Sequence, residues 1–301
     1  VAGGVTARLV GSATVEKMGK YNVLNLGNAS GYLNMTSGTG NIVKSLSDFT
    51  ISAYYRVDNG IPITGNGHFL WSFANSTSCT NTGGKYMTYR LNAQRVASSA
   101  SGSDSEAGIE VGTVTAKGRW KHVLYRQTGA YGELYVDGQR VGQNTLMPVP
   151  SELFTSRPSY CWIGRSPFAE DSYLRQTLVA DFRIYDVALS DERVAELAAA
   201  TADLDQEYYY GVVGDFTTLQ QKLDECQSYL SENGANCAPN AVAELQDVMT
   251  LASWELSAAR ASQQLIDQYV ASLTRQLSKT KATKGYQAKH VFAANDDYGF
   301  V

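Results

Sequence analysis

Two segments of the chain alternate apolar and polar positions with the period of a β-strand. In FTISAYYRV at 49–57, every second side chain from Phe49 to Val57 lies on one apolar face. At 134–141, two β-prone runs flank Asp137-Gly138, a dipeptide that tolerates the positive φ angles of a type I′ turn. The pattern predicts antiparallel strands and a tight hairpin. After Leu189 the period changes, and Ser190 is the candidate N-cap of a short helix.

Beyond residue 205 the apolar positions recur at spacings of three and four, the period of an amphipathic helix. The predicted faces run over 216–230, 242–256 and 266–277. Asn233-Gly234 ends the first helix, and Pro239 suits the first turn of the second. A single helix from 242 to 277 would put the polar Gln263 on its apolar seam, so we expect a break near Ser262.

The amino-acid composition divides the 301 residues of the chain into two parts. Gly, Ser, Thr, Asn and Tyr dominate before residue 205, whereas Gln, Leu, Ala, Asp and Glu dominate after it. We expect a β-rich domain at 1–205, a helical bundle at 206–284, and a linker at 285–301 that leads into a further domain.

Four phrases occur in order: GRWKHV at 118–123, GELYVDGQRV at 132–141, CWIGRS at 161–166 and ADFRIYDVALSDERVAEL at 180–197. They resemble the second half of laminin-G-like domains, the concanavalin-type jellyrolls, and YNVLNLGNASGYLNM at 21–35 resembles the opening strands of these domains. The resemblance implies a mainly β fold, an antiparallel jellyroll β-sandwich, here followed by a small all-α helical bundle. This fold hosts binding modules, adhesion domains, spacers and a few enzymes, so function has to be argued from sites.

The three predicted helices are similar to FIVAR-type repeats, which are found in extracellular bacterial glycan-active and cell-surface proteins. An unrelated helical linker bundle would show the same leucine spacing. The FIVAR-like resemblance implies the extracellular space, the cell surface or the periplasm of a bacterium as the location.

Charge and hydropathy exclude two classes of partner. The net charge is −4 and no Lys/Arg run occurs, so we expect no binding to nucleic acid. No apolar stretch reaches the length of about eighteen residues that a membrane span requires. We expect a monomer.

The four cysteines divide evenly between the predicted domains, as Cys79 and Cys161 and as Cys226 and Cys237. This division favours one disulfide in each domain. Four buried free thiols in a reducing compartment are the alternative. The spacing is unlike that of a zinc site, because no C-x-x-C occurs.

No pattern in the chain predicts catalysis. Sandwiches that hydrolyse β-glucans carry an E-x-D-x-x-E strand with two carboxylates across the sugar, and this chain has no such string. It also lacks H-E-x-x-H and G-x-S-x-G. Among its three histidines, His122 occupies a position where the resembling family has a structural histidine. We therefore expect no enzyme in this chain, and any catalytic domain to lie outside it.

The resemblance implies a structural calcium ion. Jellyrolls of this kind often hold Ca²⁺ beside the last strand with carboxylate and carbonyl oxygens, the ligands that this ion prefers. Members often show two acids before the R-I-Y strand, where this chain has Ala180-Asp181. Asp181 is the candidate ligand, although it is equally suited to be a surface acid opposite Arg183.

Nineteen tyrosines favour a sugar ligand, because sugar faces stack on aromatic rings whose polar tips form hydrogen bonds. The loop candidates for ligand binding are Arg165, Phe168, Asp171, Tyr173 and Tyr131. The sequence thus predicts a non-catalytic extracellular carbohydrate-recognition module for a polysaccharide or other glycan, as the accessory part of a larger polysaccharide-processing protein. The alternative is a structural or adhesion spacer with no affinity for glycans.

Overall fold

The computed structural model describes residues 5–156, 158–210 and 213–286, so almost all of the predicted linker at 285–301 lies outside the described residues. The chain forms two compact units, Val1–Tyr208 and Tyr209–Val301. Helix α4 (Thr201–Tyr210) crosses the boundary expected at residue 205. In the described parts of the chain, none of the helices is both long and apolar enough to cross a membrane.

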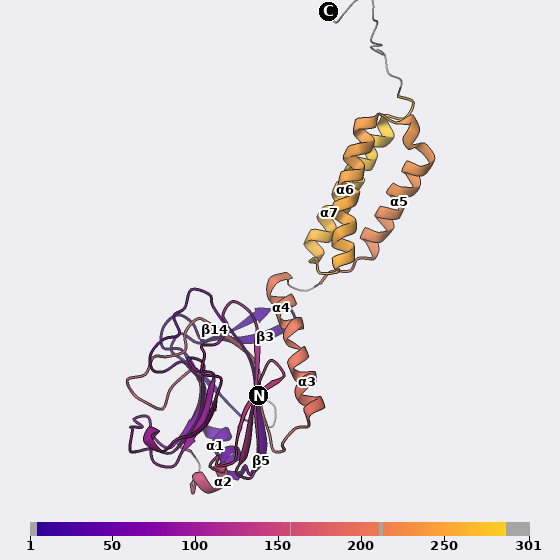
Figure 1. Ribbon diagram of the computed structural model, residues 1–301. Helices are drawn as coiled ribbons and strands as arrows, with labels where there is room; N and C mark the ends of the chain where they lie inside the picture. Colours follow the sequence, from indigo (N-terminus) through magenta and orange to yellow (C-terminus); the bar gives the residue numbers. More distant parts are fainter. Residues whose placement is uncertain (1–4, 157, 211–212, 287–301) are drawn as a thin grey trace, which may run out of the picture. The chain divides into compact units, whose positions relative to one another are not determined.

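The first unit is the predicted β-sandwich, made of two antiparallel sheets with seven described strands each (Figure 1). Sheet A contains, in spatial order, β1 (Arg8–Val10), β4 (Tyr32–Asn34), β13 (Tyr160–Ile163), β6 (Phe69–Ala74), β7 (Tyr86–Arg90), β8 (Arg95–Ser99) and β9 (Ala107–Glu110). Sheet B contains β12 (Gln139–Asn144), β11 (Tyr131–Val136), β10 (Lys121–Thr128), β5 (Asp48–Val57), β14 (Thr177–Tyr185), β3 (Tyr21–Asn25) and β2 (Thr14–Met18).

The core lies between the sheets and follows from the alternation read in the sequence. Phe49, Ile51 and Tyr55 of β5 are among its members and have exposed fractions of 1% or less. The predicted hairpin is confirmed: β11 and β12 flank Asp137-Gly138, and both residues have positive φ, 49° and 79°. Because glycine carries no Cβ, it adopts this left-handed conformation without steric cost.

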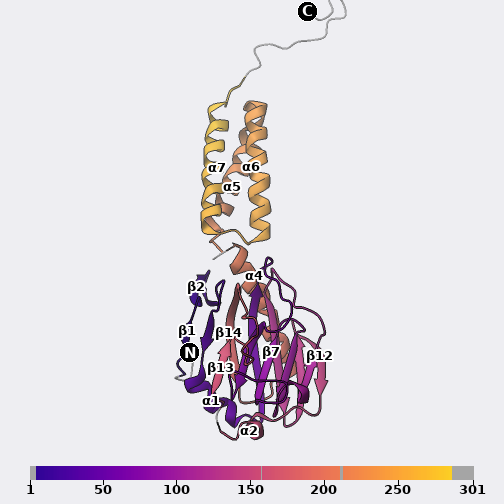
Figure 2. The same ribbon diagram turned by 90° about the vertical axis from the view of Figure 1, so that its left-hand side faces the viewer.

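Helices occupy one end and one face of the sandwich. The short helices α1 (Thr36–Ser45) and α2 (Pro150–Leu153) lie side by side at one end (Figures 1 and 2). Helix α3 (Asp191–Ala199), capped by Ser190 as predicted, covers the outer face of sheet B. There Val194 and Leu197 pack against Leu124 and Tyr135. A 3₁₀ turn, η2 (Ser103–Ser105), precedes β9.

The second unit is a bundle of three helices, α5 (Thr217–Asn233), α6 (Pro239–Ala258) and α7 (Gln263–Ala282), with a 3₁₀ turn, η3 (Gly234–Asn236), after α5. The predicted break is confirmed, because Ala259 adopts a left-handed conformation with φ of 50° and Ser262 caps α7. Leu219, Leu245 and Leu273, one from each helix, meet in the bundle core. The resemblance to FIVAR-type repeats stays a prediction.

The predicted disulfides are corrected, because all four cysteines are buried and none of them forms a disulfide. Cys161 points into the core between the sheets, whereas Cys79 packs with Ala74 and Tyr86 in a separate cluster. The two thiols therefore lie on opposite faces of sheet A and cannot bond. In the bundle, Cys226 faces the three-helix core, while Cys237 Sγ lies 3.4 Å from the carbonyl oxygen of Asn233.

We expect Leu273→Ala to lower the free energy of unfolding of the bundle by about 2–5 kcal/mol, because Leu273 is fully buried and its truncation leaves a cavity. The matched control is Leu251→Ala on α6, whose side chain is 57% exposed and should change the stability by less than about 0.5 kcal/mol. The measurement is urea unfolding followed by the helical circular-dichroism signal. Equal unfolding midpoints for the two variants would contradict this core assignment.

Candidate functional site

One outward-facing row of sheet A crosses three strands. Arg8 on β1 pairs with Asn34 on β4, and Asn34 pairs with Trp162 on β13. Residues directly opposite one another in antiparallel strands share a face of the sheet. The sequence neighbours of Trp162, Cys161 and Ile163, belong to the core between the sheets. Arg8, Asn34 and Trp162 therefore all point away from that core.

Three aromatic rings surround the guanidinium of Arg165 on this face. Its Cζ lies 4.3 Å from the ring centroid of Trp162, 5.0 Å from that of Tyr32 and 5.7 Å from that of Tyr173. Its Nη1 donates a hydrogen bond of 3.0 Å to the Tyr32 hydroxyl. Each cation–π contact of this kind contributes roughly 0.5–2 kcal/mol. We call Tyr32, Trp162, Arg165 and Tyr173 the aromatic–arginine cluster.

A hydrogen bond from the underlying sheet holds the cluster in place, and two of its rings stay partly exposed. Ser72 Oγ on β6 donates a hydrogen bond of 2.6 Å to the carbonyl oxygen of Arg165, which fixes the backbone after β13. The rings of Tyr160 and Trp162 lie 5.0 Å apart. Trp162 is buried, while Tyr32 and Tyr173 are half-buried. The Nε1 of Trp162 has no hydrogen-bond partner among the described residues.

The loop from 165 to 175 is stabilised by its own side chains. Ser166 Oγ donates a hydrogen bond of 2.6 Å to Asp171 Oδ2 and accepts one of 3.0 Å from the backbone N–H of Phe168. Burial raises the pKa of Asp171, although the hydrogen bond from Ser166 opposes this rise. The ring of Phe168 packs on Tyr86, at a centroid distance of 5.3 Å.

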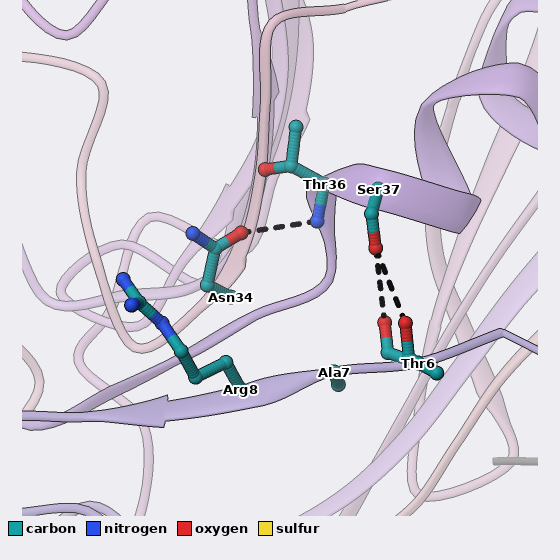
Figure 3. Close-up of a pocket in the computed structure, with 6 residues that line it drawn as sticks. All are labelled: Thr6, Ala7, Arg8, Asn34, Thr36 and Ser37. Carbon is teal, nitrogen blue, oxygen red and sulfur yellow. Dashed lines mark hydrogen bonds between the residues drawn. The ribbon is translucent and has the colours of Figure 1, made fainter.

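A polar pocket of about 570 Å³ shares strand β4 with the cluster (Figure 3). Its lining residues come from the start of the described chain, from β4 and from the first turn of α1: Thr6, Ala7, Arg8, Asn34, Thr36 and Ser37. Asn34 Oδ1 accepts a hydrogen bond of 3.0 Å from the backbone N–H of Thr36. The lining contains one guanidinium, one amide and three hydroxyl groups and no carboxylate.

The structure brings together only some of the residues predicted from the sequence. Arg165 and Tyr173 belong to the aromatic–arginine cluster, whereas Phe168 and Asp171 form contacts within and beneath their own loop. Tyr131 lies on β11 of the other sheet, where its hydroxyl donates a hydrogen bond of 2.8 Å to Gln143 Oε1. The predicted ligand-binding set is thus divided among three places.

No pattern in the sequence predicted Tyr32, Asn34 or Trp162 as site residues. Each lies within a phrase that carries the family resemblance, YNVLNLGNASGYLNM or CWIGRS. Their alternation with apolar neighbours such as Leu33 and Ile163 marks an outward face. The pairing of β4 with β13, on which their proximity depends, has no local signal in the sequence.

Residues 26–195 match the family model of the concanavalin A-like lectin/glucanases superfamily, in its laminin-G branch. The chain belongs to this superfamily. The match begins just before β4 and ends within α3, so it contains every residue of the aromatic–arginine cluster. Among curated proteins, none matches the chain.

Several solved structures are similar at low identity. Domain 4 of AbnA, a GH43 extracellular arabinanase from Geobacillus stearothermophilus solved with arabinotriose, has a TM-score of 0.49 and 15% identity, over 64% of this chain and 87% of that one. The binding domain of botulinum neurotoxin DC, solved with rat synaptotagmin II, has a TM-score of 0.48 and 16% identity, over 66% of this chain and 48% of that one. This chain thus spans about half the length of the neurotoxin chain.

The side chains around Asp181, the predicted calcium ligand, form an unfavourable donor set for this ion. Asp181 lies at a bulge of β14, with φ of 49°, and its Oδ1 accepts a hydrogen bond of 2.6 Å from Arg183 Nε. Across the described residues, no three His, Cys, Asp or Glu side chains come close enough together to hold a metal ion. These side chains do not by themselves make a calcium site, and calcium binding stays a prediction.

The most buried carboxylate of the superfamily domain has a structural role. Glu133 on β11 forms ion pairs with Arg126 at 2.6 Å and Arg140 at 2.8 Å. Burial alone would raise the pKa of Glu133, but the hydrogen bonds from the two arginines hold it below its ordinary value. Arg126 also pairs with Asp191 at the start of α3, at 2.7 Å. The network therefore fastens α3 to sheet B.

His122 on β10 is buried beneath the same helix. Its Nε2 lies 2.9 Å from Ser52 Oγ, and its ring lies 4.6 Å from that of Tyr54. Burial lowers the pKa of His122 to about 4, against the opposing effect of Asp137. These contacts agree with the structural role expected from the sequence.

The folded-state pKa of His122 lies below the ordinary value of 6.5, so the unfolded chain binds the proton more readily. We expect stability to fall as the pH falls from about 6.5 to about 4, by roughly 3 kcal/mol in total from this group. Urea unfolding across this range measures the slope, and His122→Gln should flatten it. An NMR titration in which the His122 ring protonates near pH 6.5 would contradict the prediction.

Proposed function

We propose that this chain is a non-catalytic carbohydrate-recognition module of an extracellular protein, accessory to a larger polysaccharide-processing protein. The observation that carries the proposal is the aromatic–arginine cluster with the polar pocket beside it, on the outer face of sheet A. Membership of a lectin and glucanase superfamily is compatible with this function, but members of one fold differ in function, so the proposal rests on the site.

The site combines the two kinds of group that recognise sugars. The C–H faces of a pyranose or furanose ring pack against aromatic rings, and Tyr32 and Tyr173 present partly exposed rings of this kind. The hydroxyl groups of a sugar need polar partners, and Asn34, Thr36 and Ser37 supply them at the pocket. Because Arg165 is packed among the rings, the cluster loses little conformational entropy on binding.

A spacer without glycan affinity is the second candidate, and one observation favours it. Trp162 is only 1% exposed, because its neighbours cover it, as in a cluster that serves packing alone. The half-buried rings of Tyr32 and Tyr173 distinguish the two functions. A sugar-binding site needs these rings partly exposed, whereas a spacer does not.

We expect Tyr173→Ala to weaken glycan binding roughly tenfold or more, since it removes one of the two partly exposed rings of the cluster. A glycan array with the full chain identifies the ligand, and isothermal titration calorimetry then measures the affinity. The matched control is Tyr131→Ala on the opposite sheet, which should leave the affinity unchanged. Melting temperatures of both variants report on folding.

Two outcomes would count against recognition by this cluster. A blank array with well-folded protein would favour the spacer, and an equal loss of affinity in both variants would place the binding elsewhere. Repeating the array with a chelator tests the calcium proposal separately, because only a metal-dependent site loses binding. Phe168→Ala does not serve as a probe, since Phe168 packs on Tyr86 and its removal lowers stability.

A further inference from the structure

The candidate site contains cations that no acidic side chain neutralises. Neither Arg8 nor Arg165 has an ion-pair partner within residues 5–156, 158–210 and 213–286, although twelve ion pairs occur there. No carboxylate lines the pocket or belongs to the cluster. In the row across sheet A, Arg8 and Trp162 flank Asn34, and the guanidinium of Arg165 lies over Trp162. Two guanidinium groups therefore border the same outer patch.

The first turn of α1 adds positive potential at the same place. Thr36 and Ser37, the first two residues of this ten-residue helix, line the pocket. The first turn contains no acidic residue, and the N-cap residue Met35 offers no side-chain acceptor. The N–H of Thr36 is taken by Asn34 Oδ1, but the helix dipole and the other N–H groups of the first turn favour an anion.

Two further groups at the site are donors, the amide nitrogen of Asn34 and the indole Nε1 of Trp162, while the hydroxyls of Thr6, Thr36 and Ser37 both donate and accept. Asn34 Oδ1 is occupied by the N–H of Thr36, which turns the amide nitrogen toward Arg8 (Figure 3). Trp162 Nε1 is buried and has no acceptor in the described part of the chain. An unpaired buried donor is unfavourable, and an acceptor supplied by a ligand would satisfy it. The hydroxyls of the lining can bind a neutral sugar, but only a carboxylate or sulfate also forms charge-assisted hydrogen bonds with the guanidinium groups of Arg8 and Arg165.

We propose that the site recognises a glycan bearing an anionic group, a carboxylate or a sulfate, held between Arg8 and Arg165 at the start of α1. This inference rests on the proposed function and specifies its ligand class. Planar guanidinium groups match the oxygens of these anions and form charge-assisted hydrogen bonds with them, and such bonds are stronger than neutral ones. The rings of Tyr32 and Tyr173 pack against the sugar that carries the anion.

The test compares glycans with matched backbones on the full chain. One pair is polygalacturonate and its methyl-esterified form, and the other is dextran sulfate and dextran. We expect the anionic member of at least one pair to bind at least roughly tenfold more tightly than its neutral partner. The pair that shows the difference identifies the anion as carboxylate or sulfate.

Two arginine variants test whether the anionic glycan binds at this site. Arg8→Gln should lower the affinity for the anionic glycan roughly tenfold, because Arg8 is exposed and its loss removes a charge without disturbing the cluster. The matched control is Arg260→Gln, an exposed arginine of the bundle with the same change of charge, which should have no effect. Tyr173→Ala should weaken binding as in the proposed function.

The outcomes separate this inference from the proposed function. Equal binding of anionic and neutral glycans, both weakened by Tyr173→Ala, would overturn the anion and leave carbohydrate recognition standing. Anionic binding that Arg8→Gln and Arg260→Gln reduce equally would show nonspecific attraction and also overturn the inference. The absence of binding to any glycan would overturn both proposals.

Discussion

The antiparallel pairing of β13 with β4 is the constraint on which the candidate site depends. It places Arg165 beside Tyr32, although the two residues are 133 positions apart in the sequence. The pairing is supported from α1, because Cys161 N donates a hydrogen bond of 3.0 Å to Thr36 Oγ1 and Met35 N donates one of 2.8 Å to the carbonyl oxygen of Cys161. A one-residue slip would turn Trp162 into the core and Cys161 outward. The register thus fixes the cluster and the beginning of α1 together.

The two sheets use their outer faces differently, and this difference leaves room for a site. On sheet B, α3 and the ion pairs of Glu133 cover the outer face, and Tyr54 donates a hydrogen bond to the carbonyl oxygen of Leu197. On the β1–β4–β13 side of sheet A, side chains rather than a helix cover the strands. The guanidinium of Arg165 and neighbouring aromatic rings cover Trp162 there. Arg165, Tyr32 and Tyr173 themselves stay partly in contact with solvent.

The sequence predicted those features that local patterns encode. The alternation in 49–57, the Asp137-Gly138 turn and the break at Ser262 each depend on a few consecutive residues, and all three are confirmed. Arg165 and Tyr173 could be selected because a loop rich in Arg and aromatic residues is a reasonable place for a ligand. Their partners Tyr32 and Trp162 could not, since strand order determines them. The disulfide prediction failed for the same reason: an even division of cysteines says nothing about which face of a strand each thiol occupies.

The net charge of −4 does not oppose the binding of an anion at this site. Charges on the surface are screened over about 8 Å at physiological ionic strength, so distant acids contribute little to the potential at Arg8. The near groups decide the local sign, and these are two arginines, an amide nitrogen and the positive end of a helix. Asp171, the acid closest in sequence to the cluster, is engaged by Ser166 within its own loop. The fold therefore concentrates donors on a small part of a mildly acidic molecule, and such a distribution favours specific recognition over general adhesion to polyanions.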